Sequence, residues 1–254
     1  MTADGTALAG RPNGEAVTPH EAVAAALDGR AGLTSDSVAA PDIDADCDHI
    51  DVGFGDIDAV FAVGGDALGA LSGVELDCPV VPVSAGVRRY DNGPEDLPAI
   101  AEALLAGEFE TAPHPVLGVA VDGERVRTAV ADVALMTSAP AKISEYAIET
   151  ADGWNETVRS DGVVVATPLG STGYARAGGG PTLAPETGLV TVPVSPYAMN
   201  PDVWVLRAPI TLSVERDEAD VSLHLDDDIV RSVPANVPVD VTVDRTLSLL
   251  SVRP

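Results

Sequence analysis

The sequence predicts an N-terminal α/β domain followed by a β-rich, sandwich-like domain. Three observations support this prediction. Short apolar runs alternate with helical patterns in the first half, the second half is mainly short strand patterns separated by turn residues, and 46% of the residues are hydrophobic. A chain of 254 residues with this apolar content can bury a large core in one or two domains.

The elements expected in the first half alternate between helix and strand. Residues 19–27 are rich in alanine and are expected to be helical. Residues 58–63 (DAVFAV) and 79–83 (PVVPV) are apolar runs typical of buried strands. Residues 95–105 carry apolar side chains at helical spacing on one side. This alternation favours a parallel sheet.

A domain boundary is expected at Pro113-His114-Pro115, because two prolines around one residue interrupt both helices and strands. The first domain would then span residues 1–113 and the β-rich domain residues 114–239. The last strands, about 240–254, could belong to either domain.

The second half is predicted to be mostly β, with a hairpin turn at Ala151-Asp152-Gly153 and one helical candidate beginning near Ser171. The expected strands are 116–121, 126–136, 143–150, 162–167, 189–194, 203–206, 210–214, 221–225 and the strands within 237–252.

The charge balance excludes several partners. The chain has 40 acidic and 14 basic residues, a formal net charge of −26, and Lys142 is its single lysine. Nucleic-acid binding through a basic surface is excluded, since it needs clustered Lys and Arg. The same balance argues against docking on anionic membranes. An acid excess almost without lysine is typical of a protein kept soluble in strong salt, which indicates a halophilic cytoplasm. An acidic protein of a mesophile is the alternative.

Cysteine and histidine give no sign of a resident metal. Cys47 and Cys78 are too few for a disulfide framework and lack zinc-site spacing, so a reduced cytoplasm is the expected location. No run of 18 apolar residues is present. The three consecutive aspartates at 226–228 are expected to form a tight turn rather than a cation site. The histidines are scattered and expected at the surface: His20, His49, His114 and His224.

Two segments could carry chemistry. Gly64-Gly65-Asp66 follows a predicted buried strand, where glycines allow the backbone to approach a phosphate and an aspartate can accept a proton. The alternative is an ordinary strand-to-helix turn with Asp66 as the N-cap.

The second segment starts at Asp161-Gly162 and continues as TPLGSTGYARAGGGP over residues 167–181. Its hydroxyls and glycines lie at a strand-to-helix junction, where backbone amides favour anions and Ser or Thr can bind ribose and phosphate oxygens. A flexible Gly/Ser loop is the alternative, but it does not account for the fixed order of Thr-Pro, Ser-Thr and Tyr.

This order resembles the signature of NAD kinases, in which a DG pair and an apolar strand precede TPTGSTAYxxSAGGP. Gly64-Gly65-Asp66 followed by Leu68 resembles a shortened form of the family's GGDGTxL motif. Ser195-Pro196 resembles its C/S-P-H segment, and Leu225-Asp226 resembles its VDG turn. The likeness extends from about Asp58 to the end of the chain.

The resemblance implies a nucleotide-binding first domain, a motif-bearing β-rich second domain, and a nucleotide site in the cleft between them. It implies transfer of a phosphoryl group from ATP, or polyphosphate, to the adenosine-ribose 2′-hydroxyl of NAD, with Mg²⁺ offsetting charge. It also implies a homodimer or homotetramer built through the β-rich domain. Asp66 would activate the hydroxyl. The positions that would line the NAD site are Gly64, Gly65, Asp132, Asp161, Thr172, Gly173 and Tyr174.

The chain also departs from the family pattern. Ala67 and Leu68 stand where the family has Gly-Thr, and Ala131 stands where it has the Asn of an Asn-Glu pair, leaving Asp132 as the acid. Leu169 replaces a hydroxyl residue, and Ala177 and Tyr197 replace a serine and a histidine. Two alternatives therefore stay open: a catalytically impaired paralogue that binds nucleotide as a regulator, and a kinase of the same superfamily acting on another hydroxyl compound.

Overall fold

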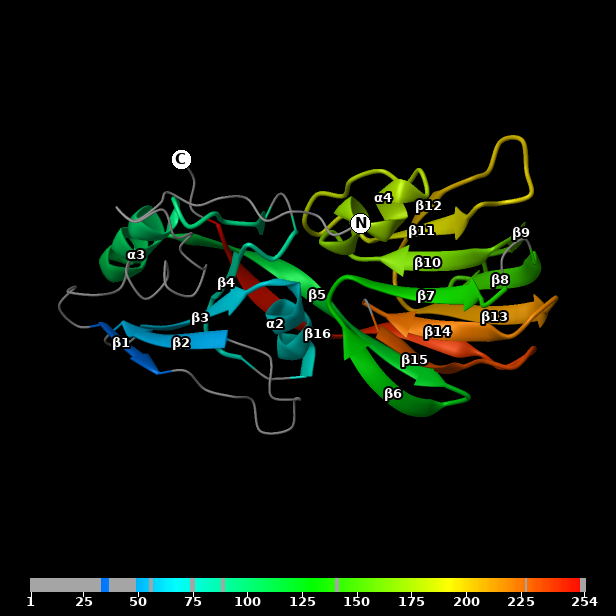
Figure 1. Cartoon of the computed structure of the whole chain (residues 1–254), viewed down its shortest axis with the longest axis horizontal. Helices are drawn as coiled ribbons and strands as arrows, with labels where there is room; N and C mark the ends of the chain where they lie inside the picture. The colour runs from blue at the N-terminus through cyan, green and yellow to red at the C-terminus, as the bar shows by residue number, and fades with distance from the viewer. Residues whose placement is uncertain are drawn as a thin grey trace, which may run out of the picture. The chain divides into compact units, whose positions relative to one another are not determined.

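The computed structural model describes residues 33–36, 49–54, 57–73, 76–87, 90–139, 142–226 and 228–251. The predicted helix at 19–27 lies outside these ranges. The chain divides into two compact units, one reaching Ala112 and including the segment from Ser248, the other spanning Pro113–Leu247 (Figure 1). The expected boundary differs from this division by one residue, and the returning segment begins at Ser248 rather than near residue 240.

The first unit contains a mixed sheet. Strands β1 (Leu33–Asp36), β2 (His49–Phe54) and β3 (Ile57–Val63) pair antiparallel in that order, whereas β3 and β4 (Val80–Val83) pair in parallel. The end of β16 (Val239–Ser251) adds a further parallel pairing at β4. The expected parallel arrangement is therefore confirmed for β3, β4 and the end of β16, whereas β1 and β2 pair antiparallel.

Helix α3 (Leu97–Ala106) covers this sheet with the apolar side that its sequence spacing predicts. Leu97, Ile100 and Leu104 pack with Phe61 and Val81 in one buried cluster. The helix ends at Gly107, whose φ of 67° is a left-handed conformation that glycine adopts without steric cost. The short helix α2 (Gly65–Ala70) follows β3 directly and runs into a 3₁₀ turn, η1 (Leu71–Gly73).

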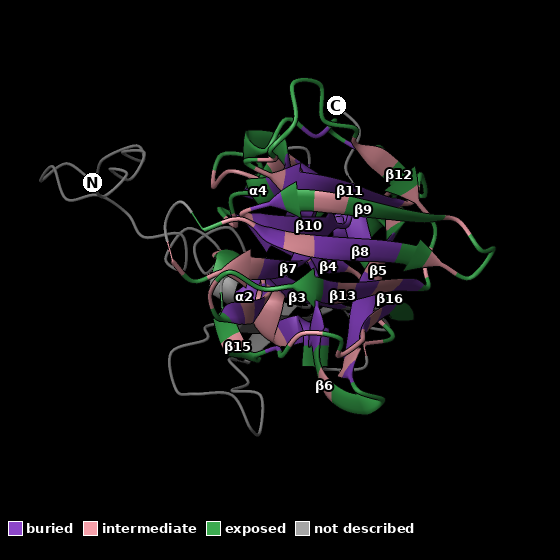
Figure 2. Cartoon of the chain, turned by 90° about the vertical axis from the view of Figure 1, so that its right-hand side faces the viewer, coloured by how far each residue is buried: buried purple, intermediate pink, exposed green. Residues whose placement is uncertain are grey.

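The second unit is a β-sandwich. One layer is the six-stranded sheet β12-β11-β10-β7-β14-β15, and the other contains β6, β5, β16, β13, β8 and β9. Buried side chains from both layers form one apolar core, and the central strands in Figure 2 are buried along most of their length. The strands first named here are β5 (Glu110–Val121), β6 (Glu124–Ala129), β7 (Asp132–Thr137), β8 (Ser144–Thr150), β9 (Asn155–Ser160), β10 (Gly162–Ala166), β11 (Leu189–Val194), β12 (Trp204–Leu206), β13 (Ile210–Arg216), β14 (Val221–Leu225) and β15 (Asp228–Ser232).

The outer face of the six-stranded sheet is also covered. A 3₁₀ turn, η3 (Gly170–Thr172), and helix α4 (Tyr174–Ala177) follow β10 and bring Ala175 and Leu183 onto β10 and β11. Because both faces are covered, all five residues of β10 are buried. The fold class predicted from the sequence, α/β followed by a β-rich sandwich, is confirmed.

Three local expectations are wrong. Strand β5 runs through Pro113-His114-Pro115 without interruption. His114 is buried, with 1% of its surface exposed, rather than on the surface. The single strand expected over 126–136 is two strands, β6 and β7, which separate at Val130-Ala131 because that segment bonds to other parts of the chain.

Candidate nucleotide-binding site

The motif segment that follows β10 is anchored by Thr167. Its side chain is buried, and its hydroxyl lies 2.7 Å from the carbonyl oxygen of Val130 and 3.0 Å from that of Ala131. Its backbone amide donates to the Ala131 carbonyl at 2.9 Å. The first hydroxyl of the motif therefore ties the end of β10 to the segment between β6 and β7.

Ser171 is also occupied within the fold. It is buried, its hydroxyl donates to the Pro168 carbonyl at 2.7 Å, and the same oxygen accepts the amide of Leu183 at 2.9 Å. Gly170 approaches the Ala131 backbone so closely that any Cβ would collide with the carbonyl of Ala131. These two residues hold the loop in shape.

The next three motif residues are accessible. Thr172 is partly buried and its hydroxyl donates to the Leu169 carbonyl at 3.0 Å. Gly173 is exposed, and half of the Tyr174 surface is exposed. Their position at the end of a fixed loop makes them available to a ligand.

Asp132 lies beside this loop. It begins β7, where it pairs with Ala166 at the end of β10, and its backbone amide donates to an Asp226 carboxylate oxygen at 3.1 Å. Asp132 thus lies at the end of β10 from which the segment that contains Thr172, Gly173 and Tyr174 continues.

Asp161 lies elsewhere. It precedes β10, so the extended strand separates it from Thr167 by about 20 Å. Its carbonyl accepts the amide of Thr137 at 2.8 Å, and its amide donates to Val194 at 2.9 Å. Asp161 and Thr172 therefore lie toward opposite ends of β10 within one chain, because the strand between them is extended and buried.

Gly64 and Gly65 connect β3 to α2. Gly64 has φ 87° and ψ 164°, a conformation essentially restricted to glycine, and its amide donates to the Val83 carbonyl at 2.9 Å. Gly64 is also the N-cap of α2. Asp66 is the second residue of that helix, so the alternative in which Asp66 is the N-cap is wrong.

The departures from the family pattern are apolar side chains inside the protein. Ala67, Leu68 and Leu169 are each no more than 2% exposed. A buried leucine at a position where the family has a hydroxyl residue contributes to packing and offers no hydrogen bond to a ligand.

His114 was missed by the sequence reasoning. Its Nε2 lies 2.8 Å from the Val130 carbonyl, and since a carbonyl only accepts, Nε2 carries the proton. Burial lowers the pKa of His114 to about 4, an effect that the backbone hydrogen bond to Val130 partly opposes. His114 lies within β5, and its side chain is buried. The sequence signal that could have indicated this burial is the pair of prolines on either side of His114 in a stretch that forms a strand.

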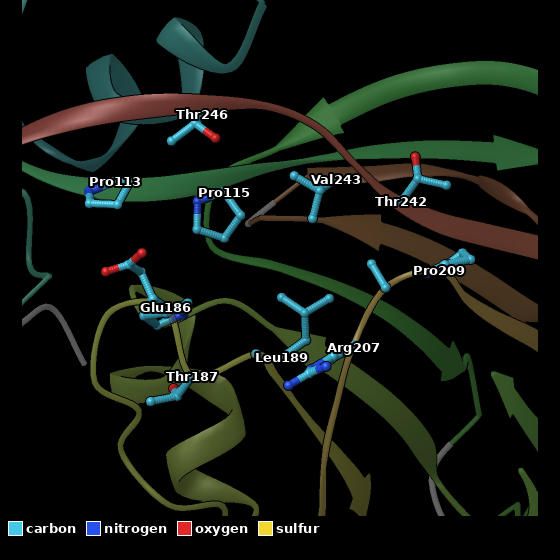
Figure 3. Close-up of a pocket in the computed structure, with 13 residues that line it drawn as sticks. Pro113, Pro115, Glu186, Thr187, Leu189, Arg207, Pro209, Thr242, Val243 and Thr246 are labelled. Atoms are coloured by element: carbon cyan, nitrogen blue, oxygen red, sulfur yellow. The ribbon is translucent and has the colours of Figure 1, made fainter. Parts of the chain in front are cut away.

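A cavity of about 640 Å³ lies within the second unit and touches the motif at Pro168 (Figure 3). Its charged lining residues are Glu186 and Arg207, and Figure 3 shows the Glu186 carboxylate on the side of Pro113 and Arg207 beside Leu189. Asp132 and residues 172–174 do not line it. The cavity is therefore distinct from the surface formed by Asp132 and residues 172–174.

Among the residues that the structure describes, no group of three or more His, Cys, Asp or Glu side chains is placed to hold a metal ion. Across the same residues, no helix is long and apolar enough to cross a membrane.

Comparison with known proteins gives one family. A family model described as the ATP-NAD kinase C-terminal domain matches residues 130–246. The NAD kinase of Pyrococcus furiosus is 31% identical over 198 residues, which cover 73% of this chain and 70% of the relative. The chain belongs to the NAD kinase family. The NAD kinase of Methanosarcina barkeri is 32% identical over 66% of this chain and 64% of its own length.

Solved structures agree on the fold. Yeast NADH kinase complexed with NADH matches with a TM-score of 0.64 at 14% identity, over 77% of this chain and 62% of that one. An NAD kinase from Archaeoglobus fulgidus in complex with ATP matches with a TM-score of 0.60 at 21% identity, over 76% and 77%. The chain spans 56–64% of the length of the three Methanosarcina NAD kinases that it matches.

Proposed function

We propose that this protein transfers the γ-phosphoryl group of ATP, or a phosphoryl group of polyphosphate, to the adenosine-ribose 2′-hydroxyl of NAD, giving NADP. The observation that carries the proposal is the motif surface of the second unit: Asp132 pairs with the last residue of β10, and the motif loop with residues 172–174 continues from that end of the strand, in a member of the NAD kinase family. The relatives bear the name NAD kinase, and two structural neighbours hold NADH and ATP.

The residues would divide the work as follows. Asp66 takes the proton from the 2′-hydroxyl as its oxygen attacks the γ-phosphorus and the bond to the leaving ADP breaks. Gly64 and Gly65 allow close approach of the backbone to phosphate, which Gly64 supports through its positive φ. Asp132, Thr172, Gly173 and Tyr174 hold the nucleotide in position.

Mg²⁺ is the divalent ion we propose for the reaction. It binds through one or two carboxylates together with substrate phosphates rather than in a cage made only of protein groups. The ion would arrive with ATP and neutralise charge on the phosphates.

We propose a homodimer or homotetramer in which a second copy supplies Asp161. A nucleotide bound at Thr172–Tyr174 cannot follow β10 to the Asp161 of the same chain, because β10 is fully buried. Mixing Asp66→Asn with Asp161→Ala subunits tests this. If the site is shared, mixed oligomers regain a fraction of wild-type activity; if each chain is self-sufficient, the mixture stays as inactive as its parents.

We propose that the protein works in a cytoplasm of high salt. A net charge of −26 should repel ATP and NAD, and screening over about 3 Å at molar salt removes that repulsion. Affinity for NAD should therefore rise with KCl up to molar concentration. A salt-independent affinity would contradict this part of the proposal.

The activity itself is tested by incubating the protein with NAD, ATP and Mg²⁺ in molar KCl and measuring NADP. NAD binding by calorimetry without NADP formation would favour the impaired paralogue, which the buried Leu68 and Leu169 support. Absence of both, with phosphorylation of another alcohol, would favour the third possibility.

A further inference from the structure

Asp226 holds the segment between β6 and β7 through three consecutive amides. One carboxylate oxygen, Oδ1, accepts the amide of Ala131 at 2.7 Å and that of Asp132 at 3.1 Å. The other, Oδ2, accepts the amide of Val130 at 3.2 Å. Asp226 returns its own amide to the Asp132 carbonyl at 2.9 Å. A carboxylate that accepts several amides fixes their directions strongly, because such bonds are charge-assisted.

The same segment is held from its other side. The Val130 carbonyl receives His114 Nε2 and the Thr167 hydroxyl, and the Ala131 carbonyl receives the Thr167 amide. The amides of residues 130–132 therefore point to one acid, while the carbonyls of 130 and 131 point to the motif strand and to β5. Small movements of Asp226 would shift Asp132 against the motif loop.

The conformation of Asp226 is itself unusual. Its φ is 53°, in the left-handed region that Asp and Asn tolerate better than other non-glycine residues. The neighbouring acid on the same turn behaves differently: Asp228 makes an exposed ion pair with Arg127 at 2.9 Å. Exposed pairs of this kind contribute little, which makes Asp228 a matched control.

We propose that Asp226 is a positioning residue for NAD phosphorylation, which sets Asp132 against the Thr172–Tyr174 surface by clamping the backbone of residues 130–132. The inference rests on the proposed function. It goes beyond packing, because it assigns the carboxylate a role in nucleotide affinity that acts through Asp132.

The test uses Asp226→Asn and Asp226→Ala in the full chain, with Asp228→Asn as control. Asparagine keeps one oxygen and tolerates the left-handed backbone, but sets an amide donor against the amide of Val130. We expect the KM and Kd for NAD to rise about tenfold in Asp226→Asn and further in Asp226→Ala. The KM for ATP should change less than twofold, and Asp228→Asn should match the wild type.

A double-mutant cycle with Asp132→Asn separates positioning from general destabilisation. If Asp226 acts through Asp132, its substitution should add little to the loss in NAD affinity already caused by Asp132→Asn. Additive losses, or a lowered Tm with an unchanged Kd for NAD, would overturn the proposal.

Amide exchange measured by NMR gives a readout independent of catalysis. The amides of Val130, Ala131 and Asp132 should exchange at least tenfold faster in Asp226→Ala than in the wild type or in Asp228→Asn; unchanged exchange would refute the clamp. A wild type that neither binds nor phosphorylates NAD defeats the proposed function and the role of Asp226 with it. If the wild type is active and the Asp226 variants keep its KM and Kd for NAD, only the proposed role of Asp226 is refuted.

Discussion

The two glycine-rich segments of this protein, 64–66 and 167–174, follow buried strands in the same way but are held differently. In the first, the turn is fixed by backbone: Gly64 takes a glycine-only conformation, and α2 has no side-chain cap hydrogen bond. In the second, side chains fix the backbone, since Thr167 and Ser171 bond within the fold.

The difference shows which motif residues are available for chemistry. In 167–174, the hydroxyls of Thr167 and Ser171 are buried and already bonded, so the residues that we propose for ligand contact are Thr172, Gly173 and Tyr174. In 64–66 no polar side chain other than Asp66 is present, and the next two residues are buried and apolar. In the first segment, polar side-chain chemistry therefore depends on the Asp66 carboxylate alone. In the second segment, the buried Thr167 and Ser171 form a scaffold that holds the accessible residues in place.

The largest expected effect follows from that dependence. Asp66→Asn should lower NADP formation by a factor of about 10² to 10⁴, the usual range for a lost general base, with little change in Tm. Asp77→Asn, an exposed acid of the same unit, is the control. NADP formation within tenfold of the wild type would refute the assignment of Asp66.

In segment 167–174, a substitution in the scaffold should lower the free energy of unfolding. Gly170→Ala places a Cβ against the Ala131 backbone, which cannot move without disturbing its bonds to Thr167 and Asp226. We expect a loss of about 1–3 kcal/mol in the free energy of unfolding, measured by denaturant titration. An unchanged unfolding midpoint would show that the 130–132 segment is less rigidly held than described.

His114 gives the scaffold a pH dependence. Its folded pKa of about 4 lies below the unfolded value of 6.5, so its neutral form stabilises the fold fully above pH 6.5. That contribution falls as pH drops toward 4, by on the order of 3 kcal/mol in total. In urea titrations, the wild type should lose stability over this range more steeply than His114→Gln, which has no titrating group. Equal slopes would contradict a buried, neutral His114.

The smallest effect is expected at Gly173. A Cβ there would lie 3.5 Å from the Gly170 carbonyl oxygen, an ordinary contact. Gly173→Ala should therefore leave stability within about 0.5 kcal/mol of the wild type and keep NADP formation within twofold. A large loss would show that a ligand needs the space at this position.

Much of the fold could be predicted from local patterns. Alternating apolar and polar residues and short apolar runs predicted the strands of the sandwich. Gly107 marks the end of α3, as is typical of a helix C-terminus. The continuous strand through Pro113 and Pro115 could not be predicted, because tertiary pairing overrode the usual effect of proline. The break at Val130-Ala131 depends on Asp226, almost 100 residues away in the sequence, and leaves no local signal.

The residue types of the candidate site could be predicted from the sequence, but their burial and their separation in space could not. The order of residues in 167–174 predicted a nucleotide motif, whereas the burial of Thr167 and Ser171 depends on partners outside it. The separation of Asp161 from Thr172 follows from an extended strand, and sequence proximity concealed it.

The most direct measurement compares the wild type and Asp66→Asn in molar KCl with NAD, ATP and Mg²⁺, followed by an NADP-specific dehydrogenase. We expect steady NADP formation by the wild type and at least a hundredfold less by the variant, while both bind NAD equally in calorimetry. NAD binding without NADP formation by the wild type would contradict this expectation.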